Sequence, residues 1–265
     1  MRTLPFGSAL VTGASSGIGA AIADELGQAG IPTVVVARRR DRLEELAGRH
    51  HGCEVLVADL TTIPGQEAVA ERIAGRGGAI DLVVNSAGFG TAGRFHDLDP
   101  GRLAREIELN VAALTRLSHA ALGAMVPRGR GWLLNVSSVA GFQAAPHLAV
   151  YAATKAFVTS LTEGLHEEVR GTGVHVTALC PGLTPTEFQQ ISSLGDDVGG
   201  YPSMLWTSAR HVARTGLADV VAGKALSVPG GVYKTLVAAS GVAPRGLVRR
   251  VSGLVQHRRR GTTHE

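Results

Sequence analysis

The chain has 265 residues, of which 45% are hydrophobic and only 4% aromatic. This length suits one large α/β unit, and so few aromatic side chains leave little for stacking on the bases of a nucleic acid. The net charge is +4, but residues 223–265 contain eight Lys or Arg and one acid, which leaves 18 basic and 21 acidic side chains elsewhere. The basic character therefore belongs to the C-terminal tail, and no nucleic-acid partner is expected.

The two cysteines and the distribution of apolar residues indicate the cellular compartment of the protein. Cys53 and Cys180 lie in different apolar runs and give no disulfide framework. Residues 1–8 contain one Arg and no apolar segment, and no apolar stretch reaches the ~18 residues of a membrane span. We therefore expect a cytoplasmic protein.

Apolar runs alternate with helical patterns along the whole chain. The near-continuous Val and Leu runs are typical of a parallel sheet that is covered on both faces, so an α/β fold is predicted. Strands are predicted at 9–11, 33–37, 54–58, 81–85, 132–136, 174–179 and 225–228, and helices at 17–29, 41–49, 66–74, 102–125, 150–170 and 209–222.

A glycine-rich segment, residues 12–19, joins the first predicted strand to the first predicted helix. Gly13 permits a tight turn, Gly17 lets a phosphate approach the backbone, and Gly19 lets the helix pack closely on the strand. The free N–H groups at the start of the helix favour an anion there. The segment therefore predicts a dinucleotide site.

Tyr151 and Lys155 stand four residues apart in a stretch with helical periodicity, so both side chains share one helix face. A nearby cation favours a phenolate and lowers the pKa of the tyrosine, which makes it usable as a general acid–base. Ser138 ends the preceding apolar run, where its hydroxyl can hold a carbonyl oxygen beside the phenol. The alternative is an ordinary tyrosine with a solvated lysine, and the glycine-rich segment argues against it.

Taken together, these motifs resemble those of the classical short-chain dehydrogenase/reductase family over roughly residues 7–231. The motifs that carry the resemblance are T-G-x-x-x-G-x-G at 12–19, Asp59-Leu60, Asn85-Ser86-Ala87-Gly88, Asn110, Ser138, Tyr151-x-x-x-Lys155 and Pro181-Gly182. The resemblance implies a Rossmann-type doubly wound parallel sheet of about seven strands in the order 3-2-1-4-5-6-7. It also implies one catalytic domain at 1–231, with a basic, helical C-terminal extension at 232–265 packed on or beside it.

The resemblance implies a catalytic tetrad of Asn110, Ser138, Tyr151 and Lys155. In it, Tyr151 exchanges a proton with the substrate oxygen, Ser138 holds that oxygen, and Lys155 binds the nicotinamide ribose and lowers the pKa of Tyr151. Asn110 would hold a water that passes protons to Lys155; otherwise it is a mid-helix polar residue near a kink. The implied cofactor contacts are Gly13, Ser15, Ser16, Gly17, Ile18, Gly19, Arg38, Arg39, Asp59, Leu60, Asn85, Ala87, Gly88, Tyr151, Lys155, Pro181, Gly182, Thr184 and Thr186, and no metal site is implied.

Charge at the end of the second predicted strand indicates the cofactor. NAD-selective members carry an acid there, which binds the ribose 2′-OH and repels a 2′-phosphate. Here Ala37 takes that position and three arginines follow it, so NADP(H) is predicted, with NAD(H) as the alternative. Arg38 is the first candidate for the 2′-phosphate and Arg39 the second, while Arg40 suits a solvated helix start.

Two positions depart from the family pattern. Ser86 stands where a second Asn is common, which weakens a local hydrogen bond. Val228-Pro229 stands where an acid often precedes the glycines, which puts the last strand of the sheet in doubt.

The segments that line the substrate site in this family are apolar here, which suggests an apolar substrate. They offer Phe142, His147, Phe188, Leu194, Met204, Leu205 and Trp206. In the tail, Leu247, Val251 and Leu254 fall on one helical face. This basic amphipathic helix either makes weak contact with an anionic membrane surface or caps the substrate cleft or a partner subunit.

We therefore predict an NADPH-dependent oxidoreductase that reduces an apolar ketone or aldehyde to an alcohol, reversibly. The alternatives are a ketoacyl or lipid-chain reductase and a non-catalytic NADP(H)-sensing protein. The long helices that begin near Arg102 and Val150 predict a homodimer or homotetramer, because family members commonly pair through these elements.

Overall fold

The computed structural model describes residues 4–75, 77–192, 202–242 and 246, and its core is a seven-stranded parallel sheet. The predicted order is confirmed: β3-β2-β1-β4-β5-β6-β7, with every neighbouring pair parallel. The strands are β1 (Ala9–Thr12), β2 (Thr33–Ala37), β3 (Cys53–Val57), β4 (Leu82–Asn85), β5 (Gly131–Val136), β6 (Val174–Leu179) and β7 (Leu226–Ser227).

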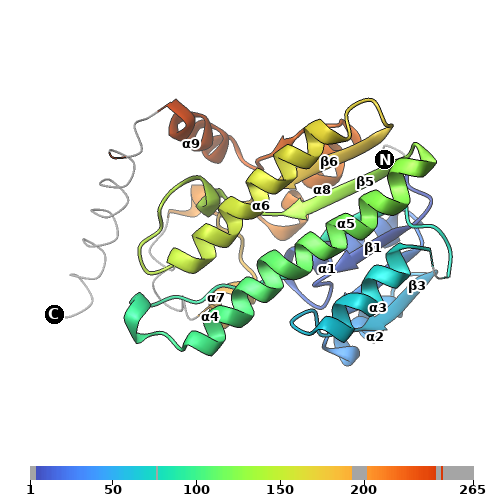
Figure 1. Cartoon of the computed structure of the whole chain (residues 1–265), viewed down its shortest axis with the longest axis horizontal. Coiled ribbons are helices and arrows are strands. Elements are labelled where there is room, and N and C mark those ends of the chain that lie inside the picture. The colour runs from blue at the N-terminus through green and yellow to red at the C-terminus, as the bar shows by residue number, and fades with distance from the viewer. Residues whose placement is uncertain (1–3, 76, 193–201, 243–245, 247–265) are drawn as a thin grey trace.

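Helices follow the strands and cover both faces of this sheet, with α5 and α6 in front of it and α1 and α8 behind it in Figure 1. Their bounds are α1 (Gly17–Gln28), α2 (Arg40–Ala47), α3 (Ile63–Ile73), α4 (Pro100–Ile107), α5 (Leu114–Met125), α6 (Ala149–Glu168), α7 (Phe188–Ile191), α8 (Ala209–Val221) and α9 (Gly231–Val242).

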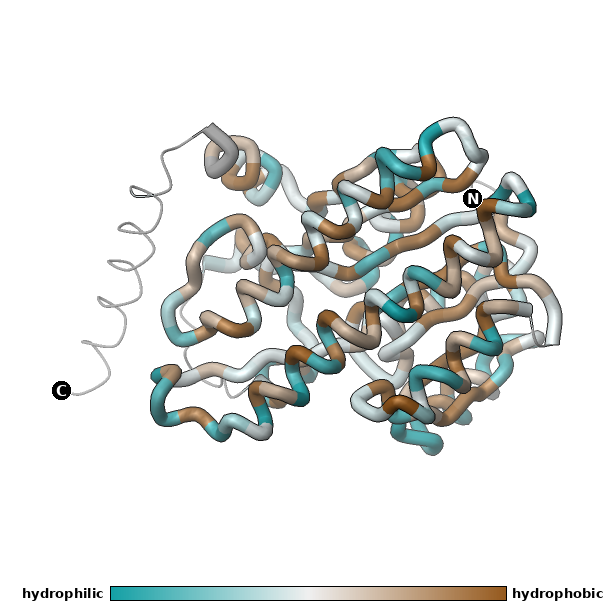
Figure 2. Tube along the Cα trace, viewed as in Figure 1, coloured by the Kyte–Doolittle hydropathy of each residue, from teal (hydrophilic) through white to brown (hydrophobic). Residues whose placement is uncertain are grey.

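Two apolar layers fill the spaces between the sheet and its helices, one layer on each face. Alternate residues of one strand point to opposite faces, so Leu10 enters the layer under α3 and α5, whereas Val11 enters the layer under α1, α2 and α8. The strands are mostly brown in Figure 2, as expected for strands buried on both sides. Because the strands are parallel, these layers hold the carboxyl ends of all strands at the same end of the sheet.

The stretch predicted as one helix at 102–125 is not a regular α-helix. Asp99 caps its start, accepting hydrogen bonds from the N–H groups of Gly101 (3.1 Å) and Arg102 (2.9 Å). A π-helical turn at Glu108–Ala113 then separates α4 from α5. Such wide turns concentrate at functional sites, and this one contains Asn110.

The last strand of the sheet, β7, is short. This agrees with the doubt that the sequence raised, because Val228-Pro229 departs from the family pattern there. β7 has two residues, and its register pairs Leu226 with Ala178 of β6. The next element, α9, packs on this edge through Tyr233, which is buried with Val228. The predicted helical face at Leu247, Val251 and Leu254 lies outside the described residues. Within the described part of the chain, no helix has the length and apolar character needed to cross a membrane.

Candidate active site

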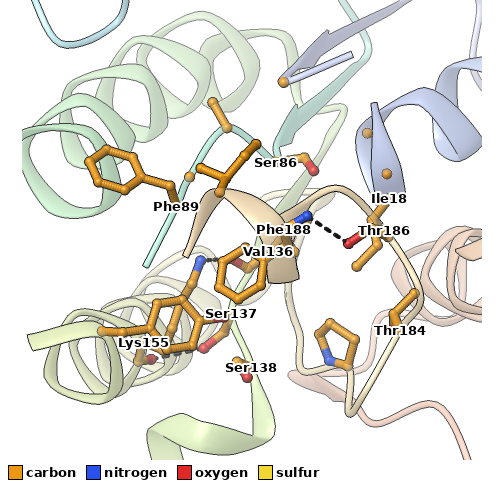
Figure 3. A pocket seen from close by; sticks show the side chains of 18 of the residues that line it. Ile18, Ser86, Phe89, Val136, Ser137, Ser138, Lys155, Thr184, Thr186 and Phe188 are labelled. Carbon is orange, nitrogen blue, oxygen red and sulfur yellow. Dashed lines mark hydrogen bonds between the residues drawn. The ribbon is translucent and has the colours of Figure 1, made fainter. Parts of the chain in front are cut away.

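A cavity of about 630 Å³ opens at the carboxyl ends of the strands. In open α/β sheets this is the edge where ligands bind, at the point where the strand order reverses. Here the reversal lies between β1 and β4, because the order runs β3-β2-β1 and then β4-β5-β6-β7. Figure 3 shows the cavity from close by, with Ser138 and Lys155 on one wall and Thr184 and Thr186 on another.

The glycine-rich segment forms one wall of the cavity in the conformation that the sequence predicts. Gly13 (φ 68°) and Gly17 (φ 59°) both adopt the left-handed region, and a Cβ on Gly19 would lie 2.4 Å from the Gly13 oxygen. Ser16 begins α1 without a side-chain capping bond, and the first turn of α1 contains no acid. The N–H groups of this turn are therefore suited to an anion, and the segment fits a pyrophosphate.

The loop after β4 is fixed against the glycine-rich segment by Thr12. The Thr12 hydroxyl oxygen accepts hydrogen bonds from the N–H groups of Ser86 (3.0 Å) and Ala87 (3.1 Å). This contact brings Ser86, Ala87 and Gly88 to the cavity wall, so the serine that departs from the family pattern still faces the site. A Cβ on Gly13 would lie 2.9 Å from the Ala87 backbone, so only glycine fits there.

Asp59 and Leu60, after β3, also line the cavity. The Asp59 carboxylate accepts hydrogen bonds from the Thr61 N–H (3.0 Å) and hydroxyl (2.8 Å), which hold it in a turn. Asn85 is the one predicted cofactor residue that is not found among the described residues of the wall. Its amide donates to the side-chain oxygen of Asn135 on β5 at 2.9 Å, inside the molecule.

Tyr151, Lys155 and Ser138 all face the cavity. The Lys155 Nζ donates a hydrogen bond to the Val136 main-chain oxygen at 2.8 Å and lies 5.8 Å from the centroid of the Tyr151 ring. Ser138 lies close enough to the phenol that its side chain opposes the rise in the pKa of Tyr151. Ser137 has a different role, because its hydroxyl donates to the main-chain oxygen of Lys155 at 2.8 Å and so ties β5 to α6. This placement agrees with the choice of Ser138 over Ser137.

The pKa of Tyr151 departs from the expectation. The spacing to Lys155 predicts a lowered pKa, whereas burial raises the pKa of Tyr151 to about 12, although the Ser138 hydrogen bond opposes the rise. Burial also lowers the pKa of Lys155 to about 8, because the ammonium loses solvation. A phenol with this pKa stays protonated at neutral pH.

Asn110 lies behind the cavity wall, in the π-helical turn. Its amide donates to the Phe89 main-chain oxygen at 2.8 Å and to the Thr154 hydroxyl at 3.1 Å, and its oxygen accepts from the Phe89 N–H at 3.1 Å. A Cβ on Gly88 would lie 2.9 Å from the Asn110 oxygen and 3.6 Å from the Lys155 Nζ. Asn110 and Lys155 therefore both lie close to Gly88.

The two arginines predicted for the 2′-phosphate differ in their surroundings. Both line the cavity. Arg38 is exposed and makes no hydrogen bond or ion pair with any residue that the structure describes. Arg39, in contrast, contacts Ser15 and forms an ion pair with Glu187 at 2.8 Å. Arg38 therefore has its guanidinium available for a phosphate.

The segment after β6 supplies the remaining predicted cofactor contacts, Pro181, Gly182, Thr184 and Thr186. The sequence analysis missed Gln189, which fixes this segment. Its amide donates to the Thr184 main-chain oxygen at 2.6 Å, and its oxygen accepts from the Thr186 N–H at 3.1 Å. No motif marks this residue, because its role depends on a turn whose geometry only the fold reveals.

The cavity wall around Tyr151 is apolar, but its residues differ in part from those that the sequence suggests for the substrate. Phe188 belongs to it, with its ring centroid 5.1 Å from that of Tyr151, and so does Leu205. In the described structure, Phe142, His147, Met204 and Trp206 are not part of the wall, and Leu194 lies outside the described residues. Further apolar side chains of the wall, which the sequence analysis did not identify, are Val139, Leu148, Leu183, Ile191 and Leu236.

Tyr233 of α9 is a second residue that the sequence analysis missed. It lines the cavity, and its hydroxyl accepts a hydrogen bond from the Leu183 N–H at 3.0 Å and donates one to the Leu205 oxygen at 2.8 Å. A Cβ on Gly182 would lie 2.0 Å from its ring. Tyr233 thus joins Leu183 to Leu205 at the cavity wall.

Comparison with known proteins agrees with this geometry. A family model described as short chain dehydrogenase matches residues 8–196. An uncharacterized oxidoreductase of Staphylococcus epidermidis is 35% identical over 189 residues, which cover 71% of this chain and 82% of that protein.

Two solved structures are similar over most of their length. A short-chain dehydrogenase from Sphingobium yanoikuyae in complex with NADPH has a TM-score of 0.80 and 32% identity, covering 88% of this chain and 92% of that chain. The bulky-bulky ketone specific alcohol dehydrogenase from Comamonas testosteroni has a TM-score of 0.74 and 28% identity, covering 98% and 94%. The sequence motifs, the sheet order, the cavity and these matches lead to one conclusion: the chain belongs to the short-chain dehydrogenase family and is an oxidoreductase.

Proposed function

We propose that this oxidoreductase uses NADPH to reduce an apolar ketone or aldehyde to an alcohol, reversibly. The observation that carries the proposal is that Ser138, Tyr151 and Lys155 line the same cavity as the glycine-rich segment. A dinucleotide bound along that cavity would supply the hydride. The glycine-rich segment would hold its pyrophosphate, and Lys155 the ribose next to the nicotinamide.

The side chains of the site suit the proton-transfer half of a carbonyl reduction. The Ser138 hydroxyl donates to the carbonyl oxygen and stabilises the negative charge that develops on it. The Tyr151 phenol, protonated at neutral pH, gives its proton to that oxygen. In the reverse direction, the deprotonated phenol would take the proton from the alcohol.

The choice of NADPH rests on charge. No acid stands at the end of β2, and Arg38 lies at the cavity with no partner among the described residues. A guanidinium binds a phosphate by two parallel hydrogen bonds. The similarity to a family member in complex with NADPH supports the same choice.

The apolar substrate class rests on the wall around Tyr151, where Phe188, Leu205 and Leu236 approach from three separate segments. A wall of this kind excludes water and favours a substrate with apolar groups on the carbonyl carbon. The similarity to a dehydrogenase specific for bulky-bulky ketones supports ketones with two large substituents as the first compounds to test.

We also propose that two copies of the chain pair through α4 and α6. A shallow apolar hollow lies on this face, lined by Ile107, Val111, Ala149, Val150, Ala153 and Thr154. Ile107 is 47% exposed there and Phe157 41%, so pairing would remove two large apolar side chains from water. Light scattering on the wild type and on Ile107→Asp tests this: the variant should be monomeric and the wild type dimeric or tetrameric.

The experiment that tests the proposed function is a panel of aryl and alkyl ketones and aldehydes assayed by NADPH oxidation. We expect turnover to rise with the apolar area of the substrate and to be much slower with NADH. Turnover that prefers charged or sugar-like substrates would contradict the substrate class. A lack of NADPH binding would contradict the function itself.

A further inference from the structure

Arg39, which lines the cavity, and Glu187 lie 148 residues apart in the chain and form an ion pair. The Arg39 Nη2 lies 2.8 Å from a Glu187 carboxylate oxygen. The same guanidinium donates to the Ser15 hydroxyl, from Nη2 at 3.1 Å and from Nε at 3.3 Å, and to the Ser15 main-chain oxygen at 3.3 Å. One side chain therefore links the glycine-rich segment to the segment after β6.

A second contact joins the same two segments. The Thr186 side chain lies over Gly17, where an added Cβ would meet it at 3.3 Å. Figure 3 shows Thr186 beside Ile18 at the start of α1, with its hydroxyl accepting a hydrogen bond from the Phe188 N–H. Gln189 fixes Thr184 and Thr186 from within, so residues 184–189 behave as one unit.

The ion pair is charged throughout the neutral range. Hydrogen bonding to Arg39 holds the pKa of the Glu187 carboxyl below its ordinary value, and the charge of Arg39 and a hydrogen bond with Ser16 act in the same direction. Arg39 is 40% exposed and Glu187 36%. Water therefore weakens the pair, so that it can open and close.

We propose that Arg39 and Glu187 are positioning residues that hold residues 184–189 over the bound dinucleotide and slow its release, whether or not the dinucleotide carries a 2′-phosphate. Arg38 alone then distinguishes NADPH from NADH. This assignment rests on the proposed function, because it presumes that the cavity binds a nicotinamide dinucleotide. It differs from the simpler view that both arginines bind the 2′-phosphate.

The geometry favours this division of roles. Arg39 already has three oxygen partners, on Ser15 and Glu187, and a carboxylate at 2.8 Å would repel a phosphate on the same guanidinium. Arg38 has no such partner among the described residues, so a phosphate there meets no competing anion. Opening the ion pair would weaken the link between the glycine-rich segment and residues 184–189, which then depends on the contact of Thr186 with Gly17.

The test is the dissociation rate constant of NADPH and of NADH, measured by stopped-flow fluorescence, for the wild type, Arg39→Ala, Glu187→Gln and Arg38→Ala. We expect Arg39→Ala and Glu187→Gln to speed release of both dinucleotides by the same factor of about five. Their preference for NADPH should equal that of the wild type. Arg38→Ala should lose the preference and release NADH at the wild-type rate.

A matched control and a double variant complete the test. Glu44→Gln breaks the exposed ion pair between Arg40 and Glu44 and should leave both rates unchanged. The double variant Arg39→Ala/Glu187→Gln should release the dinucleotides no faster than Arg39→Ala alone, because both changes break one contact.

Three results would overturn the assignment: unchanged release from Glu187→Gln, additive effects in the double variant, or an effect of Arg39→Ala on NADPH alone. The last result would make Arg39 a phosphate ligand. A wild type that binds neither dinucleotide would refute the proposed function as well, whereas normal binding with unchanged release would refute the positioning role only.

Discussion

The Lys155 Nζ donates a 2.8 Å hydrogen bond to the main-chain oxygen of Val136. This bond joins α6 to the end of β5. The same Nζ lies 5.8 Å from the centre of the Tyr151 ring. Because burial lowers the pKa of Lys155 to about 8, the charge next to the phenol changes within an accessible pH range. This relationship gives the site a defined pH dependence.

The first prediction concerns the rate of ketone reduction as the pH rises. Below pH 8 Lys155 is charged and Tyr151 is protonated, so both are in the form that the proposed reduction needs. Above pH 8 the ammonium loses its proton while the phenol, with a pKa of about 12, keeps its own. We therefore expect kcat/KM for NADPH to be level near neutrality and to fall with an apparent pKa near 8, as measured by initial rates at low NADPH concentration. A rate that rises from pH 7 to pH 9 would contradict this.

Glu106 provides a second prediction, because it is fully buried on α4 and neither carboxylate oxygen has a hydrogen-bond partner among the described residues. Burial raises its pKa, although Thr91, Arg102 and Lys155 act in the opposite direction. Its negative charge raises the pKa of Tyr151 and of Lys155.

Glu106→Gln removes that charge and keeps the shape of the side chain. The pKa of Lys155 should fall, so the decline of kcat/KM at alkaline pH should begin at a lower pH. Glu67→Gln, which changes an exposed carboxyl on α3, serves as the control and should leave that pH unchanged. If activity declines at the same alkaline pH in Glu106→Gln as in the wild type, Glu106 is not coupled to the site.

The third prediction concerns Arg38. Arg38→Ala removes the guanidinium proposed for the 2′-phosphate, so the Kd of NADPH should rise by about 10- to 100-fold, the effect of losing charged hydrogen bonds. The Kd of NADH should change little. Arg40→Ala is the matched control, since Arg40 is exposed and pairs with Glu44 on α2. Equal losses for the two dinucleotides in Arg38→Ala would show that Arg38 does not contact the 2′-phosphate.

Tyr233 is the subject of the fourth prediction. Tyr233→Phe keeps the ring against Gly182 but removes the hydroxyl that joins Leu183 to Leu205. We expect the free energy of unfolding to fall by about 1–2 kcal/mol, for two lost hydrogen bonds. The KM for an apolar ketone should rise more than the Kd of NADPH, because Leu183 and Leu205 belong to the apolar wall proposed for the substrate. Equal changes in both constants would indicate a general loss of structure instead.

Local patterns predicted the sheet well, because each strand is a short apolar run between turn residues. β2 and β6 begin and end at the predicted residues, and the glycine-rich segment follows β1 as expected. The π-helical turn at Glu108–Ala113 was not predicted. Apolar residues at helical spacing run through that stretch, and such a pattern does not distinguish a π turn from an α turn.

The rest of the site depends on contacts between distant segments, which the sequence does not show. The pairing of Arg39 with Glu187 and the contact of Tyr233 with Leu205 have no local signal. The pKa of Tyr151 was expected to fall, because the spacing to Lys155 is visible in the sequence. The depth to which the phenol is buried is not visible there, and burial dominates its pKa.

The measurement that tests the central claim most directly is a pair of experiments on Tyr151→Phe. One is the single-turnover oxidation of NADPH in the presence of an apolar ketone, and the other is the equilibrium binding of NADPH. If Tyr151 is the proton donor of an NADPH-dependent reduction, the variant should bind NADPH with nearly the wild-type Kd and oxidise it about 100- to 10,000-fold more slowly. Oxidation of NADPH by Tyr151→Phe at the wild-type rate would contradict the account.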